Sequence, residues 1–582
     1  MWSLAFVCSH RLKLLVLTGL MALEGVAVHA APLPPQAPGQ PSPASSVPMD
    51  VHLPTALADW SRGAQIFEGL GTYHRRISTS SPEAQRYFDQ GMRLLWGFNH
   101  DESTRSFARA LELDPSCAMC AWGIALTVGP NYNLPILAEP RAKIAFEATS
   151  RARSLAGSAP PVEQALIATL ALRYPNGQPL DPQSAGRVLA SYAGAMRNVA
   201  QRFPDDLDAQ TLYAEAMMTV HAWKLWNADG TPAPGTTDIL TTLESVLKRN
   251  PMHIGALHYY IHAIEASSHP EQGLAAAARL RTLAPAAGHL VHMPAHILQR
   301  VGRYEAAAEA NRRGAAADEA YLAKTGPLDY YPTMYISHNY QFLAYSAAAE
   351  GREAETLDAV QRSRASVSDA MLKEMPGMDW YVAELYTAPV RFGKWDALLT
   401  EAPPAPGLPG LVGGYLYANA VALAAKNRLT EARARLGQLD TLIAGLPAEL
   451  PAGQNTLRDV LAVGRHVVAA RIGMAEGHSE EALRDLEDAV RLEDALAYDE
   501  PSDWFFPVRH LLGMELMHEG KFQDAERVYR DDLERHPGNG WALFGLKQAL
   551  NAEGRVAEAH AAEATFQEAW RHATISIGAS AF

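Results

Sequence analysis

The sequence predicts an all-helical protein made of helix–turn–helix units stacked into a solenoid. No segment sustains the alternation of apolar and polar residues that is typical of a half-buried strand. A pattern recurs at an interval of 34 residues, which separates the same residue types in two pairs: His258 and His292, and His262 and His296. Internal repetition at 20 to 50 residues is the signature of an array of stacked repeats.

A recurring turn marks the repeat register. It consists of a Gly, often an aromatic residue two positions later, and then an Ala that lets two helices approach closely. The turns with this pattern begin at Gly302, Gly477, Gly520 and Gly554, and Gly351, Gly393 and Asn427 fit it less well. Residues 84–117 form the clearest early unit, with Gly91, Phe107, Ala110 and Pro115 at its regular positions. Roughly nine to eleven units fit the chain.

The chain divides into four predicted segments. Residues 1–30 are a signal peptide, 31–56 a Pro-rich linker, 57–405 the N-terminal repeats with a His-rich site, and 406–582 the C-terminal repeats. A length of 582 residues exceeds a single hydrophobic core, which agrees with an extended array. A formal charge of −14 without a basic stripe excludes nucleic acid as the expected partner.

The first thirty residues predict export. Basic residues precede the apolar run Leu14–Leu23, and a small-residue motif ends at Ala30, where cleavage is expected. The run is shorter than the ~20 residues that span a bilayer, so an uncleaved membrane anchor is the weaker alternative. The mature chain is therefore expected to be periplasmic or secreted, without a membrane span.

Cys117 and Cys120 form a C-x-x-C pair. In an exported protein this spacing is compatible with a disulfide, a free thiol pair or a metal contact. No thioredoxin-like pattern surrounds the pair, and the disulfide is the plainest interpretation.

Several segments resemble those of known proteins. They are Gly97–His100, Leu113–Gly123, Gly129–Asn133, Gly288–Ile297, and Tyr330–Pro332 followed by His338 and Asn339. With the 34-residue register, they make the chain similar to tetratricopeptide-repeat proteins, and in particular to a group of exported bacterial ones with His-rich and C-x-x-C segments. The resemblance implies a superhelix whose first helices face a concave, protein- or peptide-binding groove. It implies no settled biochemical activity.

In this register, a set of histidines and acids falls on the groove-facing positions of successive first helices. The candidate metal ligands are His258, His262, Glu265, His289, His292, His296, His338 and Glu215. Histidines spaced i, i+4 project from one face of a helix, so two neighbouring helices can bring four imidazoles together.

Converging imidazoles with a carboxylate are typical of a site for one transition-metal ion or two close ones, with copper, iron or zinc as candidates. Two alternatives stay open: a metal-free polar pocket for an anion or peptide carboxylate, and ordinary hydrogen-bonding histidines. Tyr259 and Met293 stand where a zinc protease of the H-E-x-x-H type has Glu, so the sequence does not support that class.

Pro294 complicates the helical argument, because proline inside a helix removes a hydrogen bond and costs about 3 kcal/mol. Either the helix is kinked there, or it begins near Met293 and leaves His289 and His292 in a loop. Both arrangements can gather ligands.

The sequence therefore predicts an exported repeat protein that binds a protein or peptide partner and carries a metal-binding, His-rich concave site. The alternative is a metalloenzyme, an oxidase or hydrolase, that uses an open metal position.

Overall fold

The computed structural model describes residues 54–180, 182–326 and 331–582, which belong to one compact unit. The predicted signal peptide, residues 31–53 of the predicted linker, and Tyr330 of the family-like segments lie outside the described residues. No helix in the described ranges is both long and apolar enough to cross a membrane.

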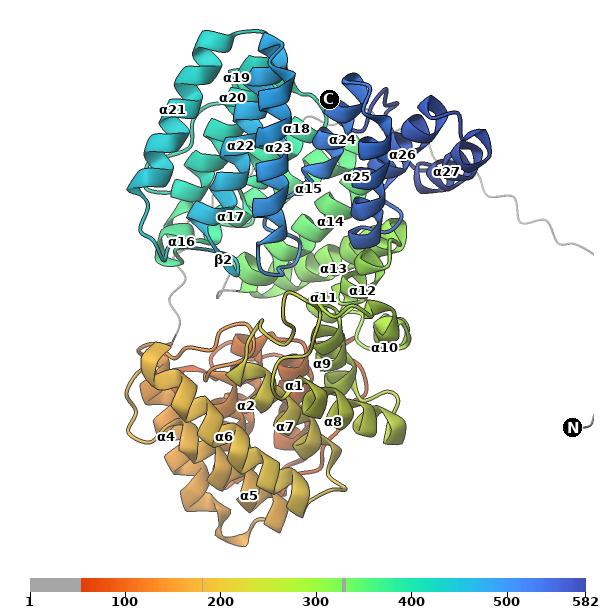
Figure 1. The fold of residues 1–582 in the computed structure, drawn as a ribbon. Helices are drawn as coiled ribbons and strands as arrows, with labels where there is room; N and C mark the ends of the chain where they lie inside the picture. The colour runs from red at the N-terminus through yellow and green to blue at the C-terminus, as the bar shows by residue number, and fades with distance from the viewer. Residues whose placement is uncertain (1–53, 181, 327–330) are drawn as a thin grey trace, which may run out of the picture. The chain divides into compact units, whose positions relative to one another are not determined.

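The chain folds almost entirely into helices (Figure 1). The first half contains α1 (Pro82–Trp96), α2 (His100–Leu113), α3 (Ala118–Thr127), α4 (Arg141–Leu155), α5 (Pro161–Leu170), α6 (Pro182–Arg202), α7 (Leu207–Val220), α8 (Thr236–Arg249), α9 (Ile254–Ile264), α10 (Leu274–Leu280), α11 (Gly288–His292), α12 (Pro294–Arg300) and α13 (Tyr304–Thr325). The second half contains α14 (Ser337–Ala349), α15 (Glu353–Ala365), α16 (Asp369–Glu374), α17 (Met378–Tyr381), α18 (Glu384–Arg391), α19 (Trp395–Thr400), α20 (Pro409–Ala425), α21 (Leu429–Gly445), α22 (Leu457–Glu476), α23 (Ser479–Asp494), α24 (Arg509–His518), α25 (Phe522–Arg535), α26 (Gly540–Ala552) and α27 (Val556–Ala569).

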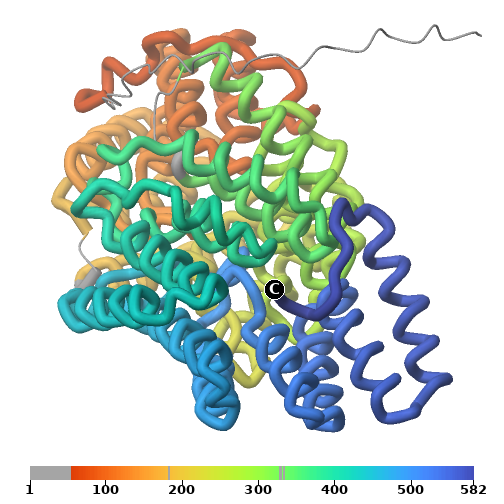
Figure 2. Tube along the Cα trace, turned by 90° about the horizontal axis from the view of Figure 1, so that it is seen from above, coloured from red at the N-terminus to blue at the C-terminus, as the bar shows by residue number. Residues whose placement is uncertain are grey.

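Consecutive helices pack against each other as hairpins, and each hairpin packs on the next, as the Cα trace in Figure 2 shows. This is the predicted all-α, tetratricopeptide-type helix–turn–helix solenoid. The predicted turn residues adopt the left-handed backbone that such hairpins need, with positive φ at Gly302, Gly351, Gly393, Asn427, Gly477, Gly520 and Gly554.

Small residues allow the first hairpins to pack closely. A Cβ atom on Gly91 of α1 would lie 2.6 Å from the ring of Phe107, and one on Gly123 of α3 would lie 2.5 Å from the same ring. The fully buried Phe107 of α2 therefore fills the space between two helices that both present glycine to it. The predicted roles of Gly91 and Phe107 are confirmed.

One prediction about secondary structure was wrong in a detail. The expectation of no sheet is contradicted by a two-stranded antiparallel hairpin of β1 (Pro451–Ala452) and β2 (Asn455–Thr456). Each strand has only two residues, too few for a periodic sequence pattern to reveal them.

Candidate metal centre

Helix α9 carries the first two candidate ligands. The helix begins after His253, whose Nδ1 accepts a hydrogen bond from the backbone N–H of Ala256 (3.2 Å) and so caps the first turn. Every residue of α9 is buried, and the i, i+4 spacing places His258 and His262 on one face with ring centroids 5.0 Å apart.

The segment around Pro294 is a broken helix. Helix α11 ends at His292, Met293 forms the junction, and α12 starts at Pro294, which occupies the first helical position. Of the two arrangements that the sequence allowed, the structure therefore has the kink, with His289 and His292 in helical geometry before it. A break between two short helices has an identifiable cause here, the missing N–H of the proline.

His338 comes from the next unit. It lies in the first turn of α14, directly after a π-helical turn that spans Pro332–Ile336. Its ring centroid is 4.9 Å from that of His292 and 5.6 Å from that of His296. Short π-helical turns occur frequently at functional sites.

These elements bring six predicted ligands together in two groups of three histidines. One group is His258, His262 and His289, and the other is His292, His296 and His338. Five of the six are at most 3% exposed, and His338 is half-buried. The sequence placed these residues on a concave, groove-facing wall, and in the structure α14 and a distant loop contact these side chains and help to bury them.

In the first group, hydrogen bonds fix which ring nitrogen of His258 and of His262 carries the lone pair. Nδ1 of His258 lies 2.6 Å from the carbonyl oxygen of Trp96, which can only accept, so Nδ1 donates and Nε2 has the lone pair. Nδ1 of His262 likewise donates to Glu265 (2.8 Å), and its buried Nε2 has no partner. Nε2 of His289 lies 3.1 Å from Nε2 of His258, and because the buried Nδ1 of His289 has no hydrogen-bond partner in the described chain, this Nε2 can carry the proton and donate to His258.

In the second group, hydrogen bonds hold the Nδ1 atoms of both His292 and His296. Asn311 donates its side-chain amide to the carbonyl oxygen of Ala307 (2.9 Å), so its Oδ1 faces Nδ1 of His292 (2.6 Å) and accepts from it. Nδ1 of His296 donates to Glu265 (2.6 Å). The two Nε2 atoms of His292 and His296 then face each other at 2.7 Å. Two lone pairs at this distance require a positive charge between them, either a proton or a metal ion.

Two carboxylates share His296. Glu265 lies at the end of α9, and Glu500 reaches Nδ1 of the same imidazole from the loop between α23 and α24. Tyr498 of that loop also donates to Glu265 (3.5 Å). The centre thus includes residues of the C-terminal repeats, whereas the sequence prediction confined it to residues 215–338.

The electrostatics of the centre favour neutral imidazoles at most positions. Burial, the largest cause, holds the pKa of four of them well below the usual value: His258, His289, His292 and His338. His296 is the exception. Burial alone would lower its pKa, but the carboxylates of Glu265 and Glu500 raise it to about 9. The proton between His292 and His296 is accordingly carried by His296.

Aromatic rings pack around the two histidine groups. Phe98 lies 4.4 Å from His258 and 5.4 Å from His289, and Tyr335 lies 4.8 Å from His289, between ring centroids. In the second group, Phe342 of α14 contacts all three rings at 4.5–4.9 Å: His292, His296 and His338.

Phe98 and a further aromatic residue beside the first histidine group, Trp223, have an unusual backbone. Phe98, in the turn between α1 and α2, has φ +56°, and Trp223, after α7, has φ +63°. Bulky residues rarely adopt this left-handed region, where the other hairpins place Gly or Asn. Both rings lie against His262, at 5.7 and 6.2 Å. Such strain clusters at functional sites.

The remaining predicted site residues lie outside the two histidine groups. Glu215 of α7 is buried and accepts from Thr219 (2.8 Å), but it belongs to none of the potential metal-ligand groups in the described chain. Burial raises the pKa of its carboxyl. Glu265 hydrogen-bonds Nδ1 of His262 in one group and of His296 in the other. It also belongs to a further potential metal-ligand group, with His262, His296 and Glu500.

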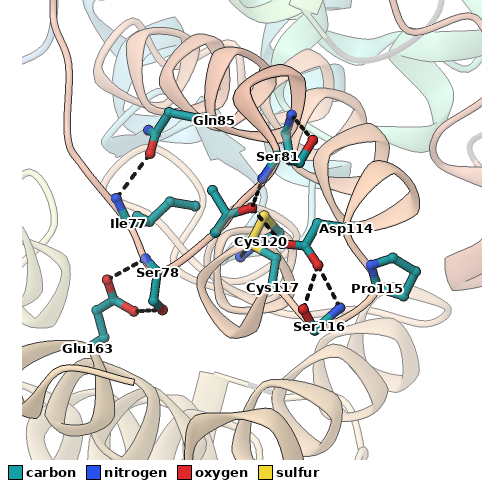
Figure 3. Close-up of a disulfide and its surroundings, with 12 residues drawn as sticks. Ile77, Ser78, Ser81, Gln85, Asp114, Pro115, Ser116, Cys117, Cys120 and Glu163 are labelled. Carbon is teal, nitrogen blue, oxygen red and sulfur yellow. Dashed lines mark hydrogen bonds between the residues drawn. A yellow bond between two sulfur atoms is a disulfide. The ribbon is translucent and has the colours of Figure 1, made fainter. Parts of the chain in front are cut away.

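Cys117 and Cys120 form a disulfide at the start of α3 (Figure 3). Both are fully buried, and Cys117 occupies the N-cap position with its sulfur accepting from the N–H of Cys120 (3.0 Å). Of the three sequence interpretations, the structure therefore has the disulfide. Asp114 lies beside it and accepts from Ser116 through both the hydroxyl and the backbone N–H.

Sequence reasoning missed Glu500 and Asn311. One signal for Glu500 was available: the turns at Gly477 and Gly520 are 43 residues apart, nine more than one repeat. The surplus falls in the segment 497–507, which is rich in acids and aromatic residues and so is unlike a plain surface loop. Asn311 lies inside a regular helix, and no local pattern distinguishes it.

Neither a protein-family model nor a curated protein sequence matches the chain. Among solved structures, the human IFIT1 dimer with m7Gppp-AAAA is similar at 12% identity, over 79% of this chain and 90% of that chain, with a TM-score of 0.33. The P58(IPK) TPR domain is similar at 11% identity over 81% and 98% of the two chains, with a TM-score of 0.22.

The structure of Naa15/Naa10 bound to HypK-THB is similar at 16% identity over 84% of this chain and 70% of that chain, with a TM-score of 0.21. Identities and TM-scores this low carry no information on what the present chain binds. The function therefore has to be inferred from the site itself.

Proposed function

We propose that this helical-repeat protein binds two transition-metal ions side by side, one at each histidine group. The observation that carries the proposal is the pairing of imidazole Nε2 atoms. In each group two of them lie 2.7–3.1 Å apart in a buried site. Other residues hold the Nδ1 atoms of His258, His292 and His296.

The spacing in the first group suits metal ligands. Two nitrogens that each lie about 2.0–2.1 Å from one ion are about 3.3 Å apart at a tetrahedral angle and about 2.9 Å apart at a right angle. The 3.1 Å pair of the first group lies in this range, whereas the 2.7 Å pair of the second group is closer and has to move apart to hold an ion. Neutral imidazole is the form that binds metals, and burial favours that form for four of the six histidines. At the second group, an ion would displace the proton that His296 shares with His292.

The orienting partners also support metal binding. Histidine ligands usually donate their second ring N–H to a carboxylate or a backbone carbonyl, which fixes the ring and increases its basicity. Glu265 supplies this contact to His262 and His296, and the Trp96 carbonyl supplies it to His258. All-nitrogen ligation is compatible with copper, iron or zinc.

A test is elemental analysis of the protein purified without a histidine tag. We expect two equivalents of metal in the native protein. His289→Ala and His292→Ala should each lose about one equivalent while keeping the helical circular dichroism. His269→Ala, at a 65% exposed side chain outside the centre, is the matched control and should keep both. Absence of metal, even after anaerobic reconstitution with each ion, would overturn the proposal.

A metalloenzyme is the second candidate, because each group offers three nitrogens and so leaves a coordination position for water or substrate. Cobalt substitution distinguishes the two functions. A change in the visible spectrum on adding azide would indicate an open position and favour an oxidase or hydrolase. An unchanged spectrum would favour a closed, structural pair of ions.

The proposal also includes export of the protein and the binding of a protein or peptide partner. The buried Cys117–Cys120 disulfide supports export, because disulfides persist in oxidising compartments. The helical-repeat scaffold supports an interaction role.

A further inference from the structure

A separate cavity of about 190 Å³ lies beside the histidine centre. Gly97 and Asn99, which flank Phe98, line it, as does Gly288, which precedes His289. Its other lining residues are Phe67, Glu68, Leu70, Leu94, Pro285, Ala286, Ala287, Ala317, Asp318, Ala320, Tyr321, Lys324 and Tyr331. Most of these side chains are apolar or aromatic, and the exposed Glu68 and Lys324 provide charge near solvent. Small-molecule sites typically combine apolar walls with a few polar groups in this way.

Asp318 is the polar group that defines the chemistry of the cavity. It is 1% exposed, and among the described residues no Lys, Arg or His forms an ion pair with it. Tyr331 donates to one carboxylate oxygen (2.9 Å) and Asn339 donates to the other (2.6 Å). Each oxygen can accept a second hydrogen bond, so the carboxylate has capacity for a ligand.

The backbone opposite Asp318 is adapted to this carboxylate. A Cβ atom on Gly288 would lie only 2.0 Å from Oδ1 of Asp318, so any other residue at the start of α11 would displace it. A buried acid without a counter-ion is unfavourable unless it is protonated or paired. Without a ligand, burial raises the pKa of Asp318 to about 8 and so keeps its carboxyl protonated at neutral pH. A cation supplied from outside would pair with the ionised carboxylate, and its binding would release that proton.

We propose that this cavity binds a small organic amine, with its ammonium group at Asp318 and its apolar body against the hydrophobic wall. Charge complementarity selects the ammonium group. The rings of Phe67, Tyr321 and Tyr331 add to the selection, because aromatic faces attract cations. Leu70 and Leu94 are buried residues that offer an apolar surface to the rest of the ligand.

The cavity is close to the centre but distinct from it. The ring of Tyr331 packs on that of Tyr335 at 5.0 Å, and Tyr335 packs on His289 at 4.8 Å. Two aromatic rings thus separate Asp318 from the first histidine group. The amine site does not depend on metal, so protein stripped with a chelator and metal-loaded protein should bind the same amine.

Isothermal titration calorimetry with 2-phenylethylamine tests the proposal. Its neutral analogue 2-phenylethanol and its anionic analogue phenylacetate have similar bodies. We expect the amine to bind at least tenfold more tightly than either analogue. No binding of the amine at millimolar concentration, or equal affinity for amine and alcohol, would overturn the proposal, and this comparison needs no variant.

Two variants locate the binding. Asp318→Asn should remove the preference for the amine. The protein should tolerate this substitution, because Oδ1 of Asn339 has no partner and can accept a hydrogen bond from the new amide once the Asn339 side chain flips. Ala317→Phe should fill the cavity and weaken all binding at least tenfold. Unchanged amine affinity in both variants would place binding elsewhere on the protein and reject this site.

Discussion

Glu500 and His296 form a buried contact between the loop after α23 and the broken helix after α10. Both side chains are at most 4% exposed. The same imidazole nitrogen also contacts Glu265, so a single histidine lies against two acids from distant repeats. Burial and the neighbouring Glu265 raise the pKa of Glu500, and this unfavourable proximity needs a positive group to hold both acids together.

Glu500→Gln should weaken metal binding at the second histidine group. The isosteric amide keeps a hydrogen-bond acceptor but removes a negative charge that increases the basicity of His296. Loss of such an orienting carboxylate typically reduces affinity by about 10–100-fold. Competition with a chromophoric chelator measures this, with Glu481→Gln, at a 70% exposed side chain, as the control. Equal affinities in the two variants would show that Glu500 does not act on the metal.

At Phe98, a glycine variant should be more stable than an alanine variant, which is the reverse of the usual order. Phe98→Ala should destabilise the protein by about 3–5 kcal/mol because a buried ring is lost. Phe98→Gly should be less harmful than Phe98→Ala by roughly 1 kcal/mol, since glycine adopts positive φ without strain. At the equally buried Phe88, inside α1, the order should be the usual one, with alanine better than glycine. Urea denaturation of the four variants checks this, and the same order at both sites would contradict the strained backbone.

Asp318 should make stability depend on pH. Burial raises the pKa of its carboxyl to about 8, whereas an unfolded chain titrates near 4. Between these values the folded protein holds a proton that the unfolded chain releases, so the contribution is fully present below about pH 4 and falls as the pH rises towards 8.

The stability of Asp318→Asn relative to the native protein should therefore increase with pH from 5 to 8, by up to about 1.4 kcal/mol per unit. Denaturant titrations at each pH measure the difference. Asp205→Asn, at a 96% exposed side chain, is the control and should show no such trend. A difference that is constant with pH would mean that Asp318 is ionised in the folded protein.

The disulfide should be structural and unrelated to metal. Without reductant, neither Cys117 nor Cys120 should be alkylated even in the unfolded protein. Replacing both with Ala should lower the free energy of unfolding by up to about 2 kcal/mol, because the bond closes only a short loop. The metal content should stay at the native value. Loss of metal in this double variant would revive the interpretation of the pair as a metal contact.

The sequence was informative wherever a feature is local or periodic. The 34-residue interval placed His258 and His262 on α9 and their counterparts on the next unit, and the structure brings these side chains together. The turn pattern identified positions that need a left-handed backbone, including Asn427, which fitted the pattern less well. These predictions succeed because helix periodicity and turn chemistry depend on neighbouring residues.

The rest depends on contacts between distant segments. Glu500 could not be assigned to His296, because no spacing rule relates a loop to a repeat so far along the chain. Glu215 shares the repeat position of the ligand histidines but belongs to an earlier unit, and its carboxylate bonds to Thr219 instead. The burial of the histidines was also not predicted from the sequence. A repeat position shows which face of a helix a residue lies on, but it does not show which distant segment packs over that face.

The Tyr498–Glu500 loop has a consequence for how the array unfolds. In an ordinary solenoid each unit contacts only its neighbours, so the ends can open while the middle stays folded. Here an occupied centre would join α9, α11, α12 and α14 to a segment between α23 and α24. Bound metal would therefore join the N-terminal and C-terminal repeats. Without metal the repeats would unfold in separate steps, and with metal they would unfold in one cooperative transition.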